Sequence, residues 1–339
     1  MLKIVGDLCF ADWYFDLGFG IGKMLQMGEN PLVHCPINSN DIWMGNLECV
    51  VSETSENKGS DAKYFRIREK DFLNSSHCHI YNVANNHIMQ HGHLAYINTL
   101  SAISKLGQYV GSNDCRSISF ENNGSQYAII SFSLRGNEFP GKPLYWHRPE
   151  LIEIQHEYNK IANNDCKIAY MHWGNEYIDY PNLAQKKFAR WLIDIGIDLV
   201  IGCHPHVLQG YEIYKGKYIF YSIGNFLFNM PTVQTRHSVV LNISHHKNKL
   251  SVTYDYAFID ENNMPRIIDK DKVYQRFTFD YLNKKIQIDD DNEIYYSNMF
   301  KMLSEYRKAN HRWILKSLYK HDKMELIEMI SSYIKRRMT

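Results

Sequence analysis

The sequence has little excess charge of either sign. Among 339 residues, 38 lysines and arginines stand against 37 aspartates and glutamates, which leaves a formal net charge of +1. Domains that bind nucleic acid usually carry a clear basic excess, so the composition argues against DNA or RNA as a partner. Disorder is also excluded, because 45% hydrophobic and 14% aromatic residues suffice for a large core. The length fits about two domains, or one large domain with an appendage.

Paired cysteines and long hydrophobic runs are also missing. The seven cysteines are an odd number without a Cys-x-x-Cys pair, so we expect free thiols in a reducing compartment. No eighteen apolar residues run together, and no membrane-spanning helix is expected. The first apolar run is too short for a signal peptide and meets Asp7 at once. These features predict a soluble, cytoplasmic protein.

Several common functional motifs are absent too. Neither GxxxxGK[ST] nor GxGxxG occurs, which argues against P-loop nucleotide binding and a Rossmann cofactor. Ser222 lacks the preceding glycine of a nucleophile elbow, so a serine esterase is disfavoured. His91 and His93 lie near the start of a predicted helix and are expected to be solvated.

Short apolar runs are present instead, and each ends in a polar cluster. They are Leu2–Val5, Ile42–Met44, Ile80–Ala84, Ile168–Met171, Leu199–Ile201 and Tyr218–Ile223. Runs of this kind are typical of strands buried on both faces. Apolar residues recur with helical spacing over 94–106 and 184–195. The alternation predicts an α/β fold with much parallel pairing, and residues 237–260 predict a β-hairpin.

The composition changes after about residue 260. We expect residues 1–260 to form the main domain and 261–339 to form a mainly helical extension that packs on it or on a partner. Residues 301–339 hold ten basic and four acidic side chains, so this tail carries +6 and the rest −5. The tail is suited to weak peripheral contact with anionic lipid, at about 1 kcal/mol per basic residue. The interrupting acidic residues favour the alternative, a solvated helical face.

The polar clusters at the strand ends carry the chemistry. In open α/β sheets, ligands bind beyond the carboxyl ends of the strands, where the loops converge. Two carboxylates, one amide and three imidazoles occur there: Asp7, Glu48, Asn86, His172, His204 and His206. This donor set suits two divalent metal ions of the Mn, Fe, Zn or Ni class. Two ions about 3.5–4 Å apart can clamp a phosphoryl oxygen and activate water for attack.

Each of these elements has a plainer interpretation when it is taken alone. A strand-end aspartate such as Asp7 is more often a helix cap or a turn residue. Residues 85–87 could form a simple turn. Pro205 is expected to hold an extended backbone between His204 and His206, which would place both imidazoles at one metal edge. The combination favours a metal site, because six strand ends rarely carry ligand types by accident.

The motifs occur in the order of a known family. They are Gly6-Asp7, Asn46-Leu47-Glu48, Ala84-Asn85-Asn86-His87, His172-Trp173-Gly174-Asn175-Glu176-Tyr177, Gly202-Cys203-His204-Pro205-His206-Val207 and Tyr221-Ser222-Ile223-Gly224-Asn225-Phe226. Over about residues 1–240 the chain resembles the CapA capsule-synthesis (poly-γ-glutamate biosynthesis) proteins, a branch of the calcineurin-like metallophosphoesterases. The resemblance implies a four-layer α/β/β/α sandwich with the metals at the strand edge.

The resemblance also implies roles for single residues. The six residues named above would be metal ligands, with Glu48 as the bridge. His87 would match the catalytic histidine of the superfamily and would stabilise or protonate the leaving oxygen. Four further residues would lie beside the ligands without binding metal: Asn46, Asn85, Glu176 and Asn225. The implied activity is phosphoester hydrolysis in capsule or surface-polymer synthesis, on a phosphorylated or polymer-precursor substrate, with capsule-synthesis proteins as partners.

Three positions depart from the family pattern. Cys9 stands where the superfamily usually has a metal-binding histidine, so one metal would be weakly held or held through sulfur. Gln90 and Cys203 stand where the family often shows aspartate and histidine. Two alternatives therefore stay open: a non-catalytic assembly subunit with a structural metal site, and an amide hydrolase that acts on a glutamyl polymer.

Overall fold

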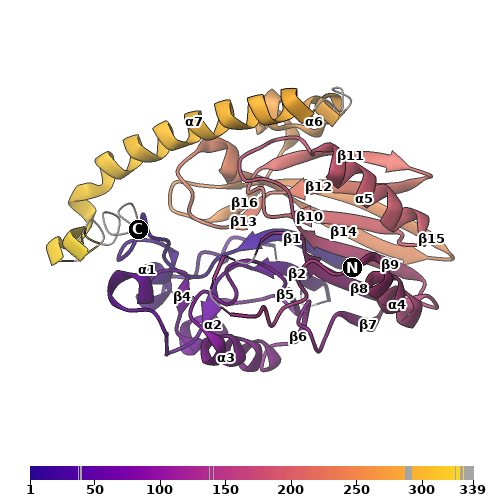
Figure 1. Cartoon of the computed structure of the whole chain (residues 1–339), viewed down its shortest axis with the longest axis horizontal. Coiled ribbons are helices and arrows are strands. Elements are labelled where there is room, and N and C mark those ends of the chain that lie inside the picture. Colours follow the sequence, from indigo (N-terminus) through magenta and orange to yellow (C-terminus); the bar gives the residue numbers. More distant parts are fainter. Residues whose placement is uncertain are drawn as a thin grey trace.

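The computed structural model describes residues 1–36, 38, 40–136, 138–139, 141–286, 292–324, 326–328 and 331. Two β-sheets pack face to face, and helices cover the outer face of each sheet (Figure 1). The layers therefore run α/β/β/α, and the predicted fold class is confirmed.

The first sheet has the strand order β16-β15-β14-β1-β2-β5-β6, with β13 beside β1. Its strands are β1 (Leu2–Leu8), β2 (Ile42–Leu47), β5 (Ile80–Asn82), β6 (Gln108–Val110), β13 (Asn225–Leu227), β14 (His237–His246), β15 (Lys249–Ile259) and β16 (Pro265–Ile268). Strands β1, β2, β5 and β6 are parallel, so their carboxyl ends share one edge. The predicted hairpin is β14–β15, and Lys247 and Asn248 in its turn both have positive φ.

The second sheet has the strand order β11-β12-β10-β9-β8-β7. Its strands are β7 (Ser117–Asn122), β8 (Ser125–Ser133), β9 (Cys166–His172), β10 (Leu199–Cys203), β11 (Leu208–Tyr214) and β12 (Lys217–Ile223). Strands β8, β9, β10 and β12 are parallel. The six predicted apolar runs are all strands, and each sheet contains three of them.

Helices close the two outer faces. Helices α1 (Ile21–Gln26), α2 (Glu69–Ser75) and α3 (His93–Ser104) lie on the first sheet, and α4 (Leu151–Ile161) and α5 (Leu183–Asp194) lie on the second. The helices predicted over 94–106 and 184–195 are therefore confirmed. Asn182 caps α5 by accepting a hydrogen bond from the Gln185 backbone. Shorter elements are β3 (Val50–Val51), β4 (Arg66–Ile67) and 3₁₀ turns at Gly59–Ala62, Val233–Arg236, Lys270–Lys272, Gln275–Phe277 and Leu318–Lys320.

The core between the sheets explains why the sequences of the strands are continuous apolar runs. Ile4 and Met44 from the first sheet meet Ile168 and Ile201 from the second, and all four are fully buried. The other faces of the same strands pack against the helices. Each such side chain contributes about 1.5–3 kcal/mol by leaving water.

The chain beyond residue 260 adds a strand to the first sheet and packs a helix on the second. Strand β16 pairs with β15, and α6 (Phe279–Ile286) packs on β11 with Phe279 in the core between the sheets. Helix α7 (Asn292–Ser317) then runs along the molecule towards α1 (Figure 1). The division at residue 260 stays a prediction, and residues 287–291, 325, 329–330 and 332–339 of the predicted extension lie outside the described residues. Within the described chain, the helices are all too short or too polar to cross a bilayer.

The two histidines near the start of α3 differ in environment. His93 is exposed as predicted, but His91 is fully buried, so the prediction of a solvated His91 is wrong. Its Nδ1 atom lies 2.8 Å from Ser55 Oγ and its Nε2 atom lies 2.9 Å from the carbonyl oxygen of Tyr64. Both ring nitrogens are satisfied, which makes His91 a structural residue.

Candidate metal centre

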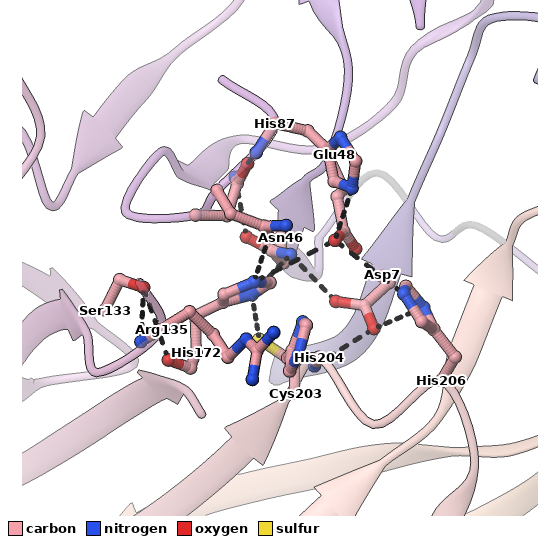
Figure 2. Close-up of polar contacts among 12 residues, drawn as sticks. Asp7, Asn46, Glu48, His87, Ser133, Arg135, His172, Cys203, His204 and His206 are labelled. Carbon is pink, nitrogen blue, oxygen red and sulfur yellow. Dashed lines mark hydrogen bonds and ion pairs between the residues drawn. The ribbon is translucent and has the colours of Figure 1, made fainter. Parts of the chain in front are cut away.

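The predicted ligands come together where the carboxyl ends of the two sheets meet (Figure 2). Three come from the first sheet: Asp7 in β1, Glu48 after β2 and Asn86 after β5. Three come from the second: His172 at the end of β9, and His204 and His206 after β10. All six are buried. The cluster therefore joins two sheet edges, whereas the pattern of strand ends predicts a site at a single edge.

The ligand atoms form two groups that share Glu48. One group is Asp7, Glu48 and His206; the other is Glu48, His172 and His204, and the atoms of each group lie within 4.8 Å of one another. Glu48 Oε1 lies 3.8 Å from His206 Nε2 and 3.9 Å from His172 Nε2. These separations are too long for hydrogen bonds. They suit atoms that each lie about 2.1 Å from a shared ion, because such atoms are roughly 3–4 Å apart.

Buried polar atoms without partners show that the cluster fits cations. Within the described part of the chain, neither carboxylate oxygen of Glu48 and neither ring nitrogen of His204 has a hydrogen-bond partner. Burial raises the pKa of Glu48 well above its usual value, and the charges of Asp7 and Glu176 add to this. Burial lowers the pKa of His204 well below its usual value, and His172 adds to this. A buried carboxylate beside neutral imidazoles costs several kcal/mol without a partner, and divalent metal ions would satisfy these atoms.

Asp7 is held in its ionised form by three neighbours. Asn46 Nδ2 donates to Asp7 Oδ1 at 2.8 Å, and the backbone N–H of His204 donates to Oδ2 at 3.2 Å. Burial raises the pKa of Asp7, but the hydrogen bond and charge of His206 outweigh it and leave the pKa below its usual value. His206 Nδ1 also lies 2.9 Å from Asn225 Oδ1. This contact leaves His206 Nε2 facing Glu48.

An amide network fixes the loop that carries Asn86 and His87. Asn46 Oδ1 accepts hydrogen bonds from Asn82 Nδ2 at 2.7 Å and from Asn85 Nδ2 at 3.1 Å. Asn85 Oδ1 in turn accepts from the backbone N–H of His87, and Asn86 Oδ1 lies 2.8 Å from a ring nitrogen of His172. Sequence reasoning missed Asn82. Its signal was a lone amide at the end of an otherwise apolar strand.

His87 lies at the open side of the cluster. Its Nε2 atom is 3.9 Å from Glu48 Oε1, and its Nδ1 atom is 2.9 Å from Gln90 Oε1. The ring stacks on Phe65 with 4.2 Å between centroids. Burial lowers the pKa of His87, while the Gln90 hydrogen bond opposes this. Gln90, which departs from the family pattern, therefore orients the ring.

The backbone around Pro205 differs from the prediction. His204 has φ +95° and His206 has φ +59°, so the segment is not extended. The two imidazoles belong to different ligand groups that share Glu48, with 5.8 Å between ring centroids. Left-handed backbone at non-glycine residues costs about 1–3 kcal/mol each and is often found at functional sites. The strain turns the two side chains towards different parts of the cluster.

The two cysteines near the centre have different positions. Cys9 Sγ donates to the carbonyl oxygen of Ala11 at 3.6 Å, and within the described residues Cys9 belongs to no ligand group. Cys203 Sγ lies 3.6 Å from His172 Nδ1 and forms a further group with His172 and Asp7. Burial raises the pKa of both thiols well above their usual value.

Two charged residues complete the surroundings. Arg135, after β8, lies beside His172 and His204 (Figure 2), and its charge contributes to the low pKa of both, behind burial. Its terminal nitrogen donates to the Gly174 carbonyl at 3.2 Å, while its Nε has no hydrogen-bond partner among the described residues. No sequence motif marked Arg135. Glu176, predicted to lie beside the ligands, forms a group with His204 and His206.

Comparisons with known proteins agree with the motif pattern. The sequence profile of the bacterial capsule synthesis protein PGA_cap matches residues 32–230. Capsule biosynthesis protein CapA of Bacillus anthracis is 27% identical over 267 residues, which cover 72% of this chain and 65% of the relative. PGA biosynthesis protein CapA of Bacillus subtilis (strain 168) is 30% identical over 263 residues, covering 73% and 68%. The match thus spans about two thirds of the length of these relatives.

Solved structures of nucleotidases show a weaker similarity. NAD nucleotidase of Haemophilus influenzae has a TM-score of 0.45 at 12% identity, over 92% of this chain and 67% of that protein. A putative 5'-nucleotidase of Staphylococcus aureus has a TM-score of 0.47 at 12% identity, over 84% and 57%.

Proposed function

Because the chain belongs to the bacterial capsule synthesis protein family PGA_cap, we propose that its buried centre is a two-metal site that hydrolyses phosphoesters in capsule or surface-polymer synthesis. The observation that carries this proposal is the pair of ligand groups that share Glu48, with His87 beside it. The unpartnered oxygens of Glu48 and nitrogens of His204 support metal ions as the missing partners.

The donor set assigns a role to each ligand. Asp7, Glu48 and His206 would hold one ion, and Glu48, Asn86, His172 and His204 would hold the other. Divalent ions of the Mn, Fe, Zn or Ni class suit these oxygen and nitrogen donors. When bound, such a pair neutralises phosphoryl oxygens and activates water.

The chain itself supplies substrate binding and help for the leaving group. His87 presents Nε2 to the cluster while Gln90 holds Nδ1, so His87 can donate a hydrogen bond to the leaving oxygen. Arg135 has an unpartnered Nε among the described residues and lies on the opposite flank. A guanidinium in this position can bind an anionic oxygen of the substrate. The substrate would therefore be a phosphorylated molecule or polymer precursor.

The test is hydrolysis by the full chain loaded with Mn²⁺, using p-nitrophenyl phosphate and bis(p-nitrophenyl) phosphate. We expect turnover that a chelator removes and Mn²⁺ restores. His87→Ala should lower kcat by about 10²–10⁴-fold with unchanged metal content. His93→Ala, an exposed histidine on α3, is the matched control and should keep full activity. The assay is repeated with Fe²⁺, Zn²⁺ and Ni²⁺. No turnover with any of the four metals, or undiminished activity of His87→Ala, would overturn the proposal.

A second function is favoured by the position of Cys9. Its thiol donates a hydrogen bond to the Ala11 carbonyl and, among the described residues, belongs to no ligand group, so one metal position would have fewer protein ligands than the superfamily pattern supplies. A relative from Mycobacterium tuberculosis, 27% identical over 228 residues, is named a probable polyglutamine synthesis accessory protein. If the protein is a non-catalytic assembly subunit with a structural metal site, cells that carry His87→Ala should still make normal amounts of polymer.

An amide hydrolase is the remaining alternative. Release of nitroaniline from γ-glutamyl-p-nitroanilide, without phosphoester cleavage, would identify it.

A further inference from the structure

The two halves of the centre differ in their protein donors. The half around His172 has four donors, because Asn86 Oδ1 lies 2.8 Å from His172 Nε2 and joins Glu48 and His204. Among the described residues, the Glu48-containing group around His206 has three members, which are Asp7, Glu48 and that histidine. This half therefore has one donor fewer than the other, and it is the half in which Cys9 departs from the superfamily pattern.

Cys9 does not supply the missing ligand. Its thiol donates to the carbonyl oxygen of Ala11, which is a local contact two residues along the chain. Within the described residues, Cys9 joins none of the four groups of potential ligands.

Glu176 reaches the cluster from the second sheet. One of its carboxylate oxygens lies within 4.8 Å of ring nitrogens of both His204 and His206, which belong to the two different halves. Both ring nitrogens of His204 are buried and have no hydrogen-bond partner within the described chain. The loop that carries Glu176 is fixed, because the next residue, Tyr177, donates its backbone N–H to the Pro205 carbonyl at 2.8 Å. Glu176 is half-buried, so part of the residue remains accessible to solvent.

We propose that Glu176 is a metal ligand, the third carboxylate of the centre, and that it replaces the ligand that Cys9 does not provide. The inference rests on the two-metal site of the proposed function. Three carboxylates would reduce the charge of two divalent ions from +4 to +1 and add a hard oxygen donor. Carboxylate oxygens suit Mn²⁺, so this ion is a suitable probe of the centre.

The experiment measures metal binding by the full chain without turnover. Metal-depleted protein is titrated with Mn²⁺ while free Mn²⁺ is followed by electron paramagnetic resonance, and retained metal is counted by elemental analysis. The wild type should bind two ions. Glu176→Gln should keep one ion and bind the other at least about tenfold more weakly, a loss typical of disrupted metal sites. Cys9→Ser should bind both ions with affinities within about twofold of wild type.

A matched control separates ligation from charge. Glu138 is an exposed carboxylate that also acts on His87 electrostatically and belongs to no ligand group of the described residues. Glu138→Gln removes the same charge and should bind both ions within about threefold of wild type. Far-ultraviolet circular dichroism checks folding. If Glu176→Gln does not fold, Glu176→Asp takes its place and should show the same weakening of one ion.

Co²⁺ adds a readout for sulfur ligation. The wild-type Co²⁺ form should lack the near-ultraviolet sulfur-to-cobalt absorption that a thiolate ligand produces. Two wild-type-like ions in Glu176→Gln, equal weakening by Glu138→Gln, or a sulfur band lost in Cys9→Ser would overturn the inference. Two bound ions without phosphoester hydrolysis would contradict only the proposed activity. A wild type that binds no metal would overturn both.

Discussion

His91 and His204 show how one residue type serves two purposes in this molecule. Both side chains are fully buried. The ring nitrogens of His91 meet Ser55 and the Tyr64 carbonyl, so the imidazole is satisfied by the protein. The ring nitrogens of His204 have no partner in the described chain and point into the cluster with Glu48. Unsatisfied buried groups are costly, which is why His204, and not His91, is assigned to a metal.

The buried, neutral His91 predicts a pH dependence of stability. Burial lowers its pKa from 6.5 to about 4 in the folded chain. Between these values the unfolded chain binds a proton that the folded chain does not, so stability falls as the pH falls from about 6.5 to 4. The loss is on the order of 3 kcal/mol at the acid end. His91→Gln should be less stable at pH 7, with a difference from wild type that shrinks towards pH 4.

Urea denaturation of the metal-free proteins at several pH values measures this difference. Without metal, pH-dependent metal binding does not add to the measured stability. The ionisable residues of the ligand cluster are the same in wild type and His91→Gln, so their titration cancels in the difference between the two proteins. His93→Gln, at an exposed position, serves as the control and should follow the wild-type curve. A constant gap between wild type and His91→Gln across this range would contradict the prediction.

At the scale of elements, the strands explain why the positions of many candidate site residues could be predicted from the sequence. A strand buried on both faces is apolar throughout, so the first polar residue marks its end. Asp7, Glu48 and His172 stand at such ends, and the structure brings them together. The roles of these residues as ligands stay predictions.

Other parts of the site depend on contacts between distant segments and have no local signal. Arg135 is a single arginine in a polar loop, and only the packing of β8 beside β9 brings it next to His172. The left-handed backbone of His204 could not be predicted from the sequence, because a residue before proline normally adopts an extended backbone. Likewise, periodicity predicts strands but does not show which sheet each strand joins, so the meeting of two sheet edges came from the family resemblance alone.

The close approach of β1 to the segment before β13 yields a prediction at this scale. A Cβ atom on Gly6 would lie 1.8 Å from the carbonyl oxygen of Gly224, which accepts the backbone N–H of Asp7. Gly6→Ala must therefore separate the two segments, and we expect a loss of about 2–4 kcal/mol in the free energy of unfolding. Asp7 and Asn225 would move apart with them.

Chemical denaturation of the metal-free variant tests this loss. Gly136→Ala is the matched control, because the nearest atom to its Cβ would be an Arg148 side-chain nitrogen at 3.7 Å, an ordinary contact. This control should stay within about 0.5 kcal/mol of wild type. If Gly6→Ala were as stable as Gly136→Ala, the close packing of β1 against Gly224 would be wrong.

At the scale of the whole molecule, α7 links the C-terminal part of the chain to the metal centre. Tyr306 of α7 is buried and stacks on Tyr177, with 3.4 Å between ring centroids. Tyr177 follows Glu176 and has its ring 6.3 Å from that of His206. A second contact joins Tyr295 of α7 to the same loop. The helix therefore supports the loop after β9 from outside.

This support predicts that Tyr306→Ala loosens the loop after β9 at a distance from its own helix. Loss of a buried aromatic ring costs about 3–5 kcal/mol in a core. In Tyr306→Ala we expect this loss to weaken the packing of α7 on the rest of the molecule. Backbone hydrogen exchange over residues 174–180 should become at least about tenfold faster, because opening free energies are local. Phe300→Ala, on the same helix but 68% exposed, should leave the exchange unchanged. Equal exchange in the two variants would show that the loop holds its position without α7, and the helix would then have no part in shaping the centre.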